Sequence, residues 1–437
     1  MPEDKPSKRL SRRQFLKSAA VVTGAAVVSG SLIEACSTAA TPSPTPAGKA
    51  PAAAATPAGK PVVTPVAEVK SSGGAPLKIG VLLPYSKVYA LLGEGITNGM
   101  NLYFESIGNA IAGRKIELIK EDEENDPQVS LRKARKLIEQ DKVDLMTGLV
   151  SSAVAYAVRD LVHQNKKILV ISNAGANDLC RKLKSPYVFR VSFSNWQPNY
   201  PMGEWIAKNV SKKIFVSGPD YAAGKEQIGA FKESFLAAGG TLLGELYPPF
   251  PNTDYGPFLT KIADAKPEAS YSFYSGSDAV AFVKQFDEYG LKKSVKLTGS
   301  GFMVDNDVLP AQGKSALGAI TGLHWADTLD NPENKKFMED YQKKFNALPT
   351  SFSVQGFDAA RVIHESLQKL NGDTSDSDKI AKAMETVKFA SPRGPFEIDP
   401  ETHNVIQNVY VREVKEVNGK LVNVVLDTIK GVKDPGK

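Results

Sequence analysis

Cysteine is scarce in this sequence, with only Cys36 and Cys180 among 437 residues. If Cys36 carries a lipid, Cys180 has no partner and no internal disulfide can form. The neighbouring Leu179 and Arg181 supply no base that would activate the Cys180 thiol as a nucleophile. We therefore expect Cys180 to be a packed or half-exposed thiol without a catalytic role.

Motifs for catalysis and metal binding are also missing. The chain contains no Walker phosphate loop, no GxSxG nucleophile elbow and no HExxH pair. Its four histidines are scattered, at His163, His324, His364 and His403. The acidic run EDEEND at 121–126 is typical of a solvated loop followed by a helix cap. The sequence therefore predicts no catalysis, no cofactor and no metal site.

The sequence also lacks a basic block interleaved with aromatic residues. Its formal net charge is +6, and residues 1–35 contribute +3 of this through six Lys or Arg and three Asp or Glu. Nucleic acid is therefore not an expected partner. A hydrophobic content of 42% in a chain of 437 residues is enough for two domains.

The apolar run near the N-terminus is too short for a membrane span. This run, Ala19–Ile33, has fifteen residues, whereas a spanning helix needs about 20. The preceding SRRQFLK, Ser11–Lys17, contains two adjacent arginines and resembles the twin-arginine export signal. We expect residues 1–35 to be a signal peptide of the twin-arginine and lipoprotein type.

Cys36 follows Ile33, Glu34 and Ala35, and this order resembles a bacterial lipobox. Glu34 departs from the small or aliphatic residue usual at its position, so cleavage by an ordinary signal peptidase is the alternative. We expect an exported protein, in the periplasm or held at the outer face of the cell membrane by a lipid on Cys36. Residues 36–76 are rich in Pro, Ala and Thr, which predicts a disordered tether.

From residue 77 onwards, apolar strands alternate with helices. The expected strands cover 77–84, 115–122, 144–150, 167–170, 213–217, 241–246, 269–274 and 295–298. The expected helices cover 94–106, 128–140, 151–164, 198–209, 224–238, 257–265 and 278–289. This alternation predicts an α/β fold with two lobes, each containing a parallel sheet with helices on both faces.

Ligands of such sheets bind beyond the carboxyl ends of the strands. The loops in that position are PYSKVYALLGEG, GLVSSA, ISNAGAND, SGPDYAAG, YSGSDA and TGSGFM. The loop ISNAGAND, residues 171–178, consists almost entirely of small residues, which would let backbone N–H groups approach a ligand closely. The residues alone leave open whether this loop binds a ligand or only turns the chain.

Several segments, taken in order, resemble one protein family. They are KIGVLLP, VDLMTGLVSS, ISNAGAN, PYVFRVSFSNWQP, DYAAGKE and GFDAAR. From about Leu77 to the C-terminus, the chain is similar to the Leu/Ile/Val-binding branch of the extracellular solute-binding proteins of ABC importers. The resemblance implies the type I periplasmic binding protein fold, in which two Rossmann-like lobes joined by three crossings close on a ligand.

The resemblance also implies the boundaries of the lobes. The crossings are expected near Phe189–Ser194, Leu323–Asp327 and Lys388–Phe396. The N-terminal lobe would comprise residues 77–192 plus 327–388, and the C-terminal lobe residues 193–326 plus 389–437.

A carboxylate site follows from the same resemblance. The Ser152 hydroxyl and the backbone N–H groups of Ala174 and Ala176 match the family's carboxylate-binding positions. Amino-acid binders usually have Thr at the position of Ala176 and an acidic residue in the loop matching 299–302, where this chain reads GSGF. A buried ammonium without its carboxylate costs about 3–5 kcal/mol, although Asp278 could substitute.

The segments NAGAN and PYVFRVSFSNWQP are closer to the aromatic-acid binders of the family. Tyr85, Tyr89, Tyr221 and Phe302 are then expected to surround an aromatic ring. The full set of expected ligand-binding residues is Tyr85, Tyr89, Ser152, Asn173, Ala174, Ala176, Tyr221, Ser277, Asp278, Ser300 and Phe302.

The sequence therefore predicts a substrate-binding protein that captures a small carboxylate, preferably an aromatic one, and presents it to a membrane permease. A branched-chain amino acid, or an amide or urea-like solute, is an alternative ligand. A sensor that reports the ligand to a signalling partner is an alternative of another class. The expected partners are the ligand, the ABC permease subunits and the membrane surface, and the protein is expected to be a monomer.

Overall fold

The structure is a computed structural model that describes residues 74–437. The expected signal peptide (1–35), the lipidation site Cys36 and most of the expected tether (36–76) lie outside the described residues. Within 74–437, no helix combines the length and apolar character needed to cross a membrane.

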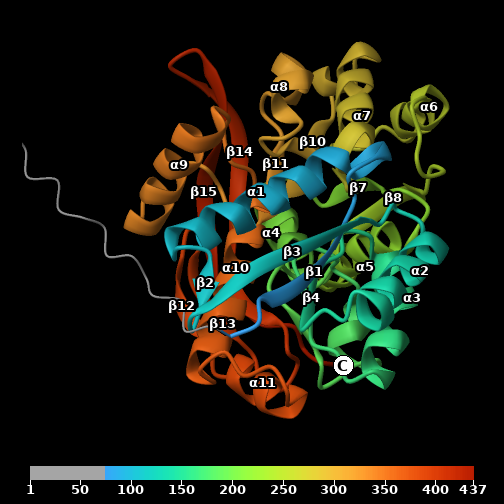
Figure 1. The fold of residues 1–437 in the computed structure, drawn as a ribbon. Coiled ribbons are helices and arrows are strands. Elements are labelled where there is room, and N and C mark those ends of the chain that lie inside the picture. The colour runs from blue at the N-terminus through green and yellow to red at the C-terminus, as the bar shows by residue number, and fades with distance from the viewer. Residues whose placement is uncertain (1–73) are drawn as a thin grey trace, which may run out of the picture. The chain divides into compact units, whose positions relative to one another are not determined.

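The first sheet has six strands and is almost entirely parallel (Figure 1). Its order is β2 (Ala110–Ile111), β3 (Arg114–Asp122), β1 (Leu77–Leu83), β4 (Leu145–Gly148), β5 (Leu169–Ile171) and β6 (Val188–Arg190). Only β2 is antiparallel to its neighbour. The carboxyl ends of β4 and β5 therefore meet at one edge, where the loops at 149–152 and 172–178 lie side by side.

The second sheet has nine strands and mixed directions. Its order is β12 (Lys388–Ser391), β13 (Gly394–Ile398), β14 (Val405–Val417), β11 (Ile320–Leu323), β10 (Lys296–Ser300), β9 (Ala269–Ser272), β7 (Lys213–Ser217) and β8 (Thr241–Leu246), with β15 (Lys420–Val432) paired to β14. The strands from β11 to β8 are parallel, whereas β14 is antiparallel to β11, β13 and β15.

The expectation of wholly parallel sheets is therefore wrong for this second sheet. Strands β14 and β15 form a hairpin whose two-residue turn is Asn418 and Gly419, both with positive φ, at 51° and 74°. Asn-Gly is a strong signal for a two-residue hairpin turn. The sequence pattern predicts individual strands and helices only up to residue 298, so it does not predict the antiparallel strands β12 to β15.

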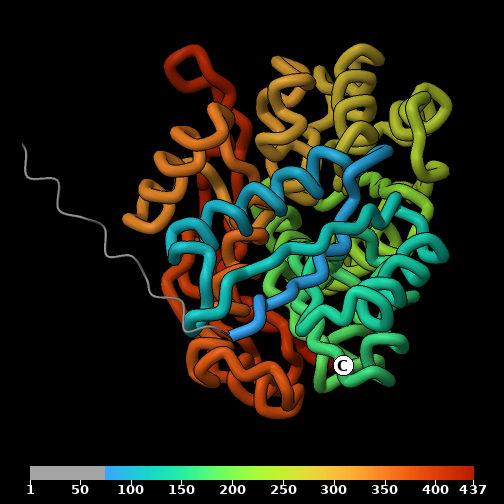
Figure 2. Tube along the Cα trace, viewed as in Figure 1, coloured from blue at the N-terminus to red at the C-terminus, as the bar shows by residue number. Residues whose placement is uncertain are grey.

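Helices cover both faces of each sheet. Beside the first sheet lie α1 (Ala90–Ser106), α2 (Pro127–Arg135), α3 (Ser152–Gln164), α9 (Pro332–Phe345), α10 (Ser351–Lys369) and α11 (Ser377–Met384). Beside the second lie α4 (Tyr200–Asn209), α5 (Ala222–Ala237), α6 (Gly256–Ala265), α7 (Gly276–Glu288) and the short α8 (Leu309–Gln312). Figure 2 shows the orange α10 beside the blue α1, although these helices are far apart in sequence.

Strand β1 shows why the first sheet is buried on both sides. Leu77, Ile79 and Val81 belong to the hydrophobic cluster that contains Met100 of α1. Leu82 belongs to a different cluster on the opposite face, built largely from α2 and α3. Successive side chains of a strand point to opposite faces, so a continuous apolar run is what a doubly covered strand requires.

The chain passes between the two sheets three times. The first passage follows β6 and leads to α4, and the second follows β11 and leads to α9, which packs on α1. The third leads from α11 to β12. Each sheet and the helices beside it are therefore assembled from separate segments of the chain, while the expected lobe boundaries stay a prediction.

Candidate ligand-binding site

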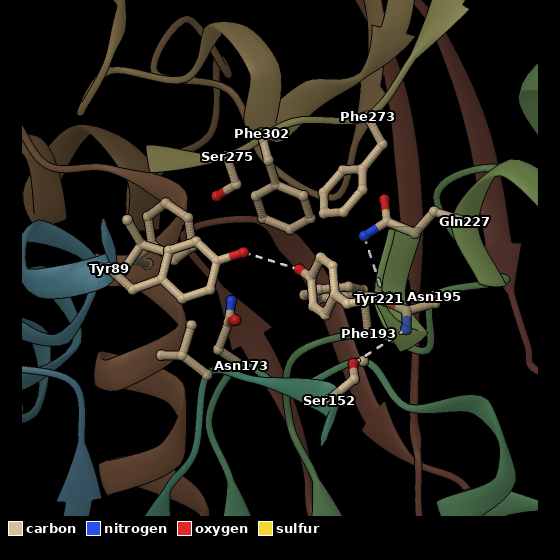
Figure 3. A pocket seen from close by; sticks show the side chains of 15 residues that line it. Tyr89, Ser152, Asn173, Phe193, Asn195, Tyr221, Gln227, Phe273, Ser275 and Phe302 are labelled. Atoms are coloured by element: carbon tan, nitrogen blue, oxygen red, sulfur yellow. Dashed lines mark hydrogen bonds between the residues drawn. The ribbon is translucent and has the colours of Figure 1, made fainter. Parts of the chain in front are cut away.

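A buried pocket is lined by residues from the layers around both sheets and holds a cavity of about 20 Å³ (Figure 3). This is room for about one water molecule, so the lining side chains fill most of the site in this conformation. The lining residues are Tyr89, Leu92, Val150, Ser152, Asn173, Gly175, Phe193, Asn195, Tyr221, Ala223, Gln227, Phe273, Ser275, Phe302 and Phe352.

The lining is aromatic and carries no formal charge. Six of its side chains are Phe or Tyr, and the polar ones are Ser, Asn, Gln and Tyr. The ring of Phe302 lies 4.9 Å from that of Phe193 and 5.5 Å from that of Phe352, measured between centroids. Within residues 74–437, no group of three or more His, Cys, Asp or Glu side chains is arranged to hold a metal ion. Such a wall suits a flat apolar ligand.

Ser152 supplies a hydroxyl at the start of α3, where the helix dipole favours an anion. The side-chain amide of Asn195 donates to Ser152 Oγ at 3.2 Å. Because the serine oxygen accepts this bond, its own hydrogen stays available to a ligand. The carboxamide of Gln227 donates in turn to Asn195 Oδ1 at 3.3 Å. The three side chains form the polar end of the pocket (Figure 3).

Glu123 lies behind this polar end and is fully buried. Its two carboxyl oxygens accept the N–H groups of Val150 and Ser151, at 3.0 and 3.1 Å. Burial raises the pKa of Glu123 to about 8, although the two N–H donors lower it. A protonated Glu123 places no negative charge behind Ser152, which favours a carboxylate ligand there.

The loop 171–178 is tightly packed, which explains its small residues. A Cβ atom on Gly175 would lie 2.3 Å from Asn195 Oδ1 and 2.6 Å from a ring carbon of Phe193. The Ala174 N–H donates to the carbonyl of Leu149 at 2.9 Å, so this expected donor is already engaged. The N–H groups of Gly175 and Ala176 donate to no other group in the described chain. The loop therefore packs tightly, and its Gly175, which lines the pocket, has an N–H group without an acceptor among the described residues.

Tyr89 and Tyr221 meet across the pocket from opposite sides. Tyr89 precedes α1, Tyr221 is the N-cap of α5, and their hydroxyl oxygens are 2.8 Å apart (Figure 3). Burial raises the pKa of both above 10, so both hydroxyls stay protonated. Whichever hydroxyl donates, the other keeps a hydrogen for a further acceptor.

The structure brings some of the expected site residues together and places others elsewhere. Those that line the pocket are Tyr89, Ser152, Asn173, Tyr221 and Phe302. Those that do not line it are Tyr85, Ala174, Ala176, Ser277, Asp278 and Ser300.

Three of the expected residues that do not line the pocket have other contacts or face solvent. The Tyr85 hydroxyl pairs with Thr97 Oγ1 at 2.9 Å. Ser277 is exposed on α7. Asp278 is buried and accepts the Asn252 N–H at 3.2 Å and the Tyr255 hydroxyl at 3.2 Å.

Ten lining residues were missed by sequence reasoning. They are Leu92, Val150, Gly175, Phe193, Asn195, Ala223, Gln227, Phe273, Ser275 and Phe352. Phe193 and Asn195 belong to PYVFRVSFSNWQP, which was singled out only as a family signature, so that segment carried a usable signal. Phe352 lies at the start of α10, and nothing local in its sequence points to a ligand.

Comparisons with known proteins identify the family of the chain and its export signal. A profile of the family described as periplasmic binding protein matches residues 76–420. A profile of the twin-arginine translocation signal matches residues 9–29, which confirms the expected export signal. The Leu/Ile/Val-binding protein homolog 6 of Brucella melitensis is 32% identical over 82% of this chain and 93% of its own.

Two solved structures are similar over most of the chain. The solute-binding protein of an ABC transporter from Rhodopseudomonas palustris BisB5, in complex with 3,4-dihydroxybenzoic acid, is 36% identical with a TM-score of 0.79, covering 83% of this chain and 99% of that one. A second from R. palustris, in complex with benzoate, is also 36% identical with a TM-score of 0.77, covering 81% and 98%. This chain therefore belongs to the periplasmic binding protein family and has its type I fold.

Proposed function

We propose that this protein captures an aromatic monocarboxylate in the buried pocket and delivers it to the membrane permease of an ABC importer. The observation that carries the proposal is the lining itself, which combines six aromatic rings with neutral hydrogen-bond donors. The similar proteins from R. palustris hold benzoate and 3,4-dihydroxybenzoate. A ligand of this class matches both the flat apolar wall and the polar end at Ser152.

In the proposed complex, the carboxylate lies at the start of α3. The Ser152 hydroxyl and the N–H group of Gly175 donate to it, and the helix dipole adds a favourable field. Neutral donors held in place by their surroundings are enough to bind an anion in a site shielded from water. The rings of Phe193 and Phe302, which pack against each other, then form one apolar wall beside the ligand.

An amino acid fits this pocket less well, because nothing in the lining can neutralise an ammonium group. No lining residue is Asp or Glu. Asp278 lies outside the lining, and its oxygens are engaged by Asn252 and Tyr255. A buried ammonium without a carboxylate partner costs about 3–5 kcal/mol, which is on the order of 10² to 10³ in affinity.

Ligand capture is proposed to occur by closure of two lobes. These are residues 77–192 plus 327–388 and residues 193–326 plus 389–437. The bond between Tyr89 and Tyr221 joins the two proposed lobes, as does the bond from the Ser351 N–H to Asp305 at 2.8 Å. A lipid on Cys36 is proposed to hold the exported protein at the membrane, near its permease.

Calorimetric titration tests the proposed ligand class. The protein is first freed of bound ligand by partial unfolding and refolding, and is then titrated with benzoate, 4-hydroxybenzoate, leucine and phenylalanine. We expect micromolar or tighter binding of at least one benzoate and no measurable binding of leucine. Tight binding of leucine without binding of either benzoate would overturn the proposal.

A further inference from the structure

Glu226 lies on α5, beside the second sheet, and its carboxylate accepts three hydrogen bonds, two of them from residues around the first sheet. The Tyr156 hydroxyl donates to Oε1 at 2.6 Å. The Asn177 N–H and the Asn195 side-chain amide donate to Oε2, at 2.8 and 2.9 Å. Tyr156 belongs to α3 and Asn177 follows β5, so two of these donors come from the layers around the first sheet.

The donors are themselves held in place. The Tyr156 hydroxyl accepts the Asp178 N–H at 3.2 Å while it donates to Glu226. Burial, and the neighbouring Glu226 carboxylate, raise the pKa of Tyr156, so this hydroxyl stays protonated and remains a donor. The side chain of Asn177 accepts the Trp196 N–H at 2.9 Å. One carboxylate therefore joins α5, α3, the loop after β5 and the first passage between the sheets.

Glu226 does not line the pocket, but it touches a residue that does. Asn195 Nδ2 donates one hydrogen to Glu226 and the other to Ser152 Oγ. This arrangement fixes the orientation of the Asn195 amide, because both of its hydrogens have acceptors. The orientation in turn makes Ser152 an acceptor toward Asn195 and leaves the serine hydrogen for the ligand. The next residue on α5, Gln227, lines the pocket directly.

We propose that Glu226 is a closure latch and a positioning residue for the ligand site. Its carboxylate binds the side of the pocket built on the first sheet when the two sides come together, and it turns Asn195 so that Ser152 donates to the ligand. Hydrogen bonds to an ionised acceptor are stronger than those between neutral groups, and three of them converge here. The latch rests on the proposed function, since it acts on retention of the ligand in that pocket.

The latch predicts slower release of the ligand rather than faster capture. Glu226→Gln keeps the size of the side chain, but it replaces one acceptor oxygen with an NH₂ group that faces an N–H or O–H donor. We expect the dissociation rate constant of benzoate or 4-hydroxybenzoate, measured by stopped-flow fluorescence, to rise at least about tenfold. The association rate constant should change by less than about threefold.

Two further variants separate the latch from a general structural effect. Glu233→Gln lies on the same helix at an exposed position and should leave both rate constants unchanged. Tyr156→Phe removes one donor and should raise the dissociation rate less than Glu226→Gln does. In the double variant the two effects should be less than additive, because both substitutions break the same contact.

Hydrogen exchange at residues 171–183 gives a second readout that needs no added ligand. Glu226→Gln should expose the amides of Asn177 and Asp178, which donate to Glu226 and to Tyr156 in the latch. Unchanged dissociation rates in Glu226→Gln would overturn the latch while leaving the proposed function intact. If the wild-type protein binds neither benzoate nor 4-hydroxybenzoate, the proposed function fails. The latch is then tested by hydrogen exchange alone, and unchanged exchange at 171–183 in Glu226→Gln would overturn it.

Discussion

Ser152 is the residue on which the polar end of the pocket depends most directly. Its hydroxyl accepts from Asn195, keeps one free hydrogen and lies at the N-terminus of α3. Ser152→Ala removes that donor and leaves a carboxylate oxygen without one of its partners. We expect the affinity for benzoate to fall by about 10- to 100-fold, since a hydrogen bond to a charged group contributes about 1.5–3 kcal/mol. Calorimetric titration measures the loss.

The matched control for this substitution is Ser277→Ala. Ser277 was an expected ligand residue, but it is exposed on α7 and does not line the pocket. Its replacement should change the affinity for benzoate by less than about twofold. A larger effect at Ser277 than at Ser152 would show that the ligand lies elsewhere.

Asp278 distinguishes an aromatic acid from an amino acid as the ligand. Its carboxylate serves Asn252 and Tyr255 rather than the pocket. Asp278→Asn should therefore leave the affinity for benzoate within about twofold of wild type, while lowering the free energy of unfolding by about 1 kcal/mol through the weakened acceptor. If the natural ligand carried an ammonium held by Asp278, its affinity would instead collapse in this variant, which titration with leucine would reveal.

Individual lining residues could be predicted where a residue type suited to ligand binding lies in a segment that resembles the family. Ser152 and Tyr221 follow strands in loops that the sequence marks, and both line the pocket. Gln227 lies one turn into α5, in a stretch that reads as an ordinary helix. Phe352 reaches the pocket only because α10 packs against α1, and no local pattern encodes a contact between segments so far apart in the chain.

At the scale of elements, the start of α3 is shaped by a buried carboxyl group. Glu123 accepts two N–H groups there, and burial raises its pKa from an ordinary value of 4.5 to about 8. Between these values the folded protein holds a proton that the unfolded chain releases. The free energy of unfolding should therefore fall as pH rises from about 4.5 to about 8, by at most about 1.4 kcal/mol per pH unit from this group.

Glu123→Gln has no such proton to lose, so its stability relative to wild type should improve as pH rises from 5 to 8. Urea denaturation at both pH values measures the difference between the two proteins. Glu124→Gln is the matched control, since Glu124 is a partly exposed neighbour paired with Lys87. A wild type and a Glu123→Gln variant with the same pH dependence would show that Glu123 is ionised throughout this range.

Elements with a strong local signal were predicted closely. Asp126 caps α2 by accepting the N–H groups of Gln128 and Val129, as the Asp-Pro pair at 126–127 indicated. That helix ends sooner than expected, because the turn at Lys136–Gln140 is a π-helix rather than a continuation of the α-helix. The end of an element depends on how its last turn packs, and a sequence pattern encodes that poorly.

At the scale of the whole molecule, Arg393 connects the passages between the two sheets. Its guanidinium donates to the carbonyls of Val191 and Ser192 in the first passage, at 2.8 and 3.1 Å. It also pairs with Asp358 of α10 at 2.6 Å and donates to Gln407 of β14 at 2.8 Å. Arg393 and Asp358 are both fully buried, so water cannot solvate either charge if its partner is removed.

Replacement of Arg393 should destabilise the entire fold rather than one site. Arg393→Met leaves the Asp358 carboxylate buried without its cation, and we expect the free energy of unfolding to fall by about 3–5 kcal/mol in urea denaturation. The double variant Arg393→Met/Asp358→Asn should lose less than the sum of the single variants, because it removes the uncompensated charge as well. Arg135→Met breaks an exposed pair with Glu139 and should cost less than about 1 kcal/mol. Equal losses of unfolding free energy for Arg393→Met and Arg135→Met would mean that the buried ion pair contributes no net stability. The passages between the two sheets would then be held by packing alone.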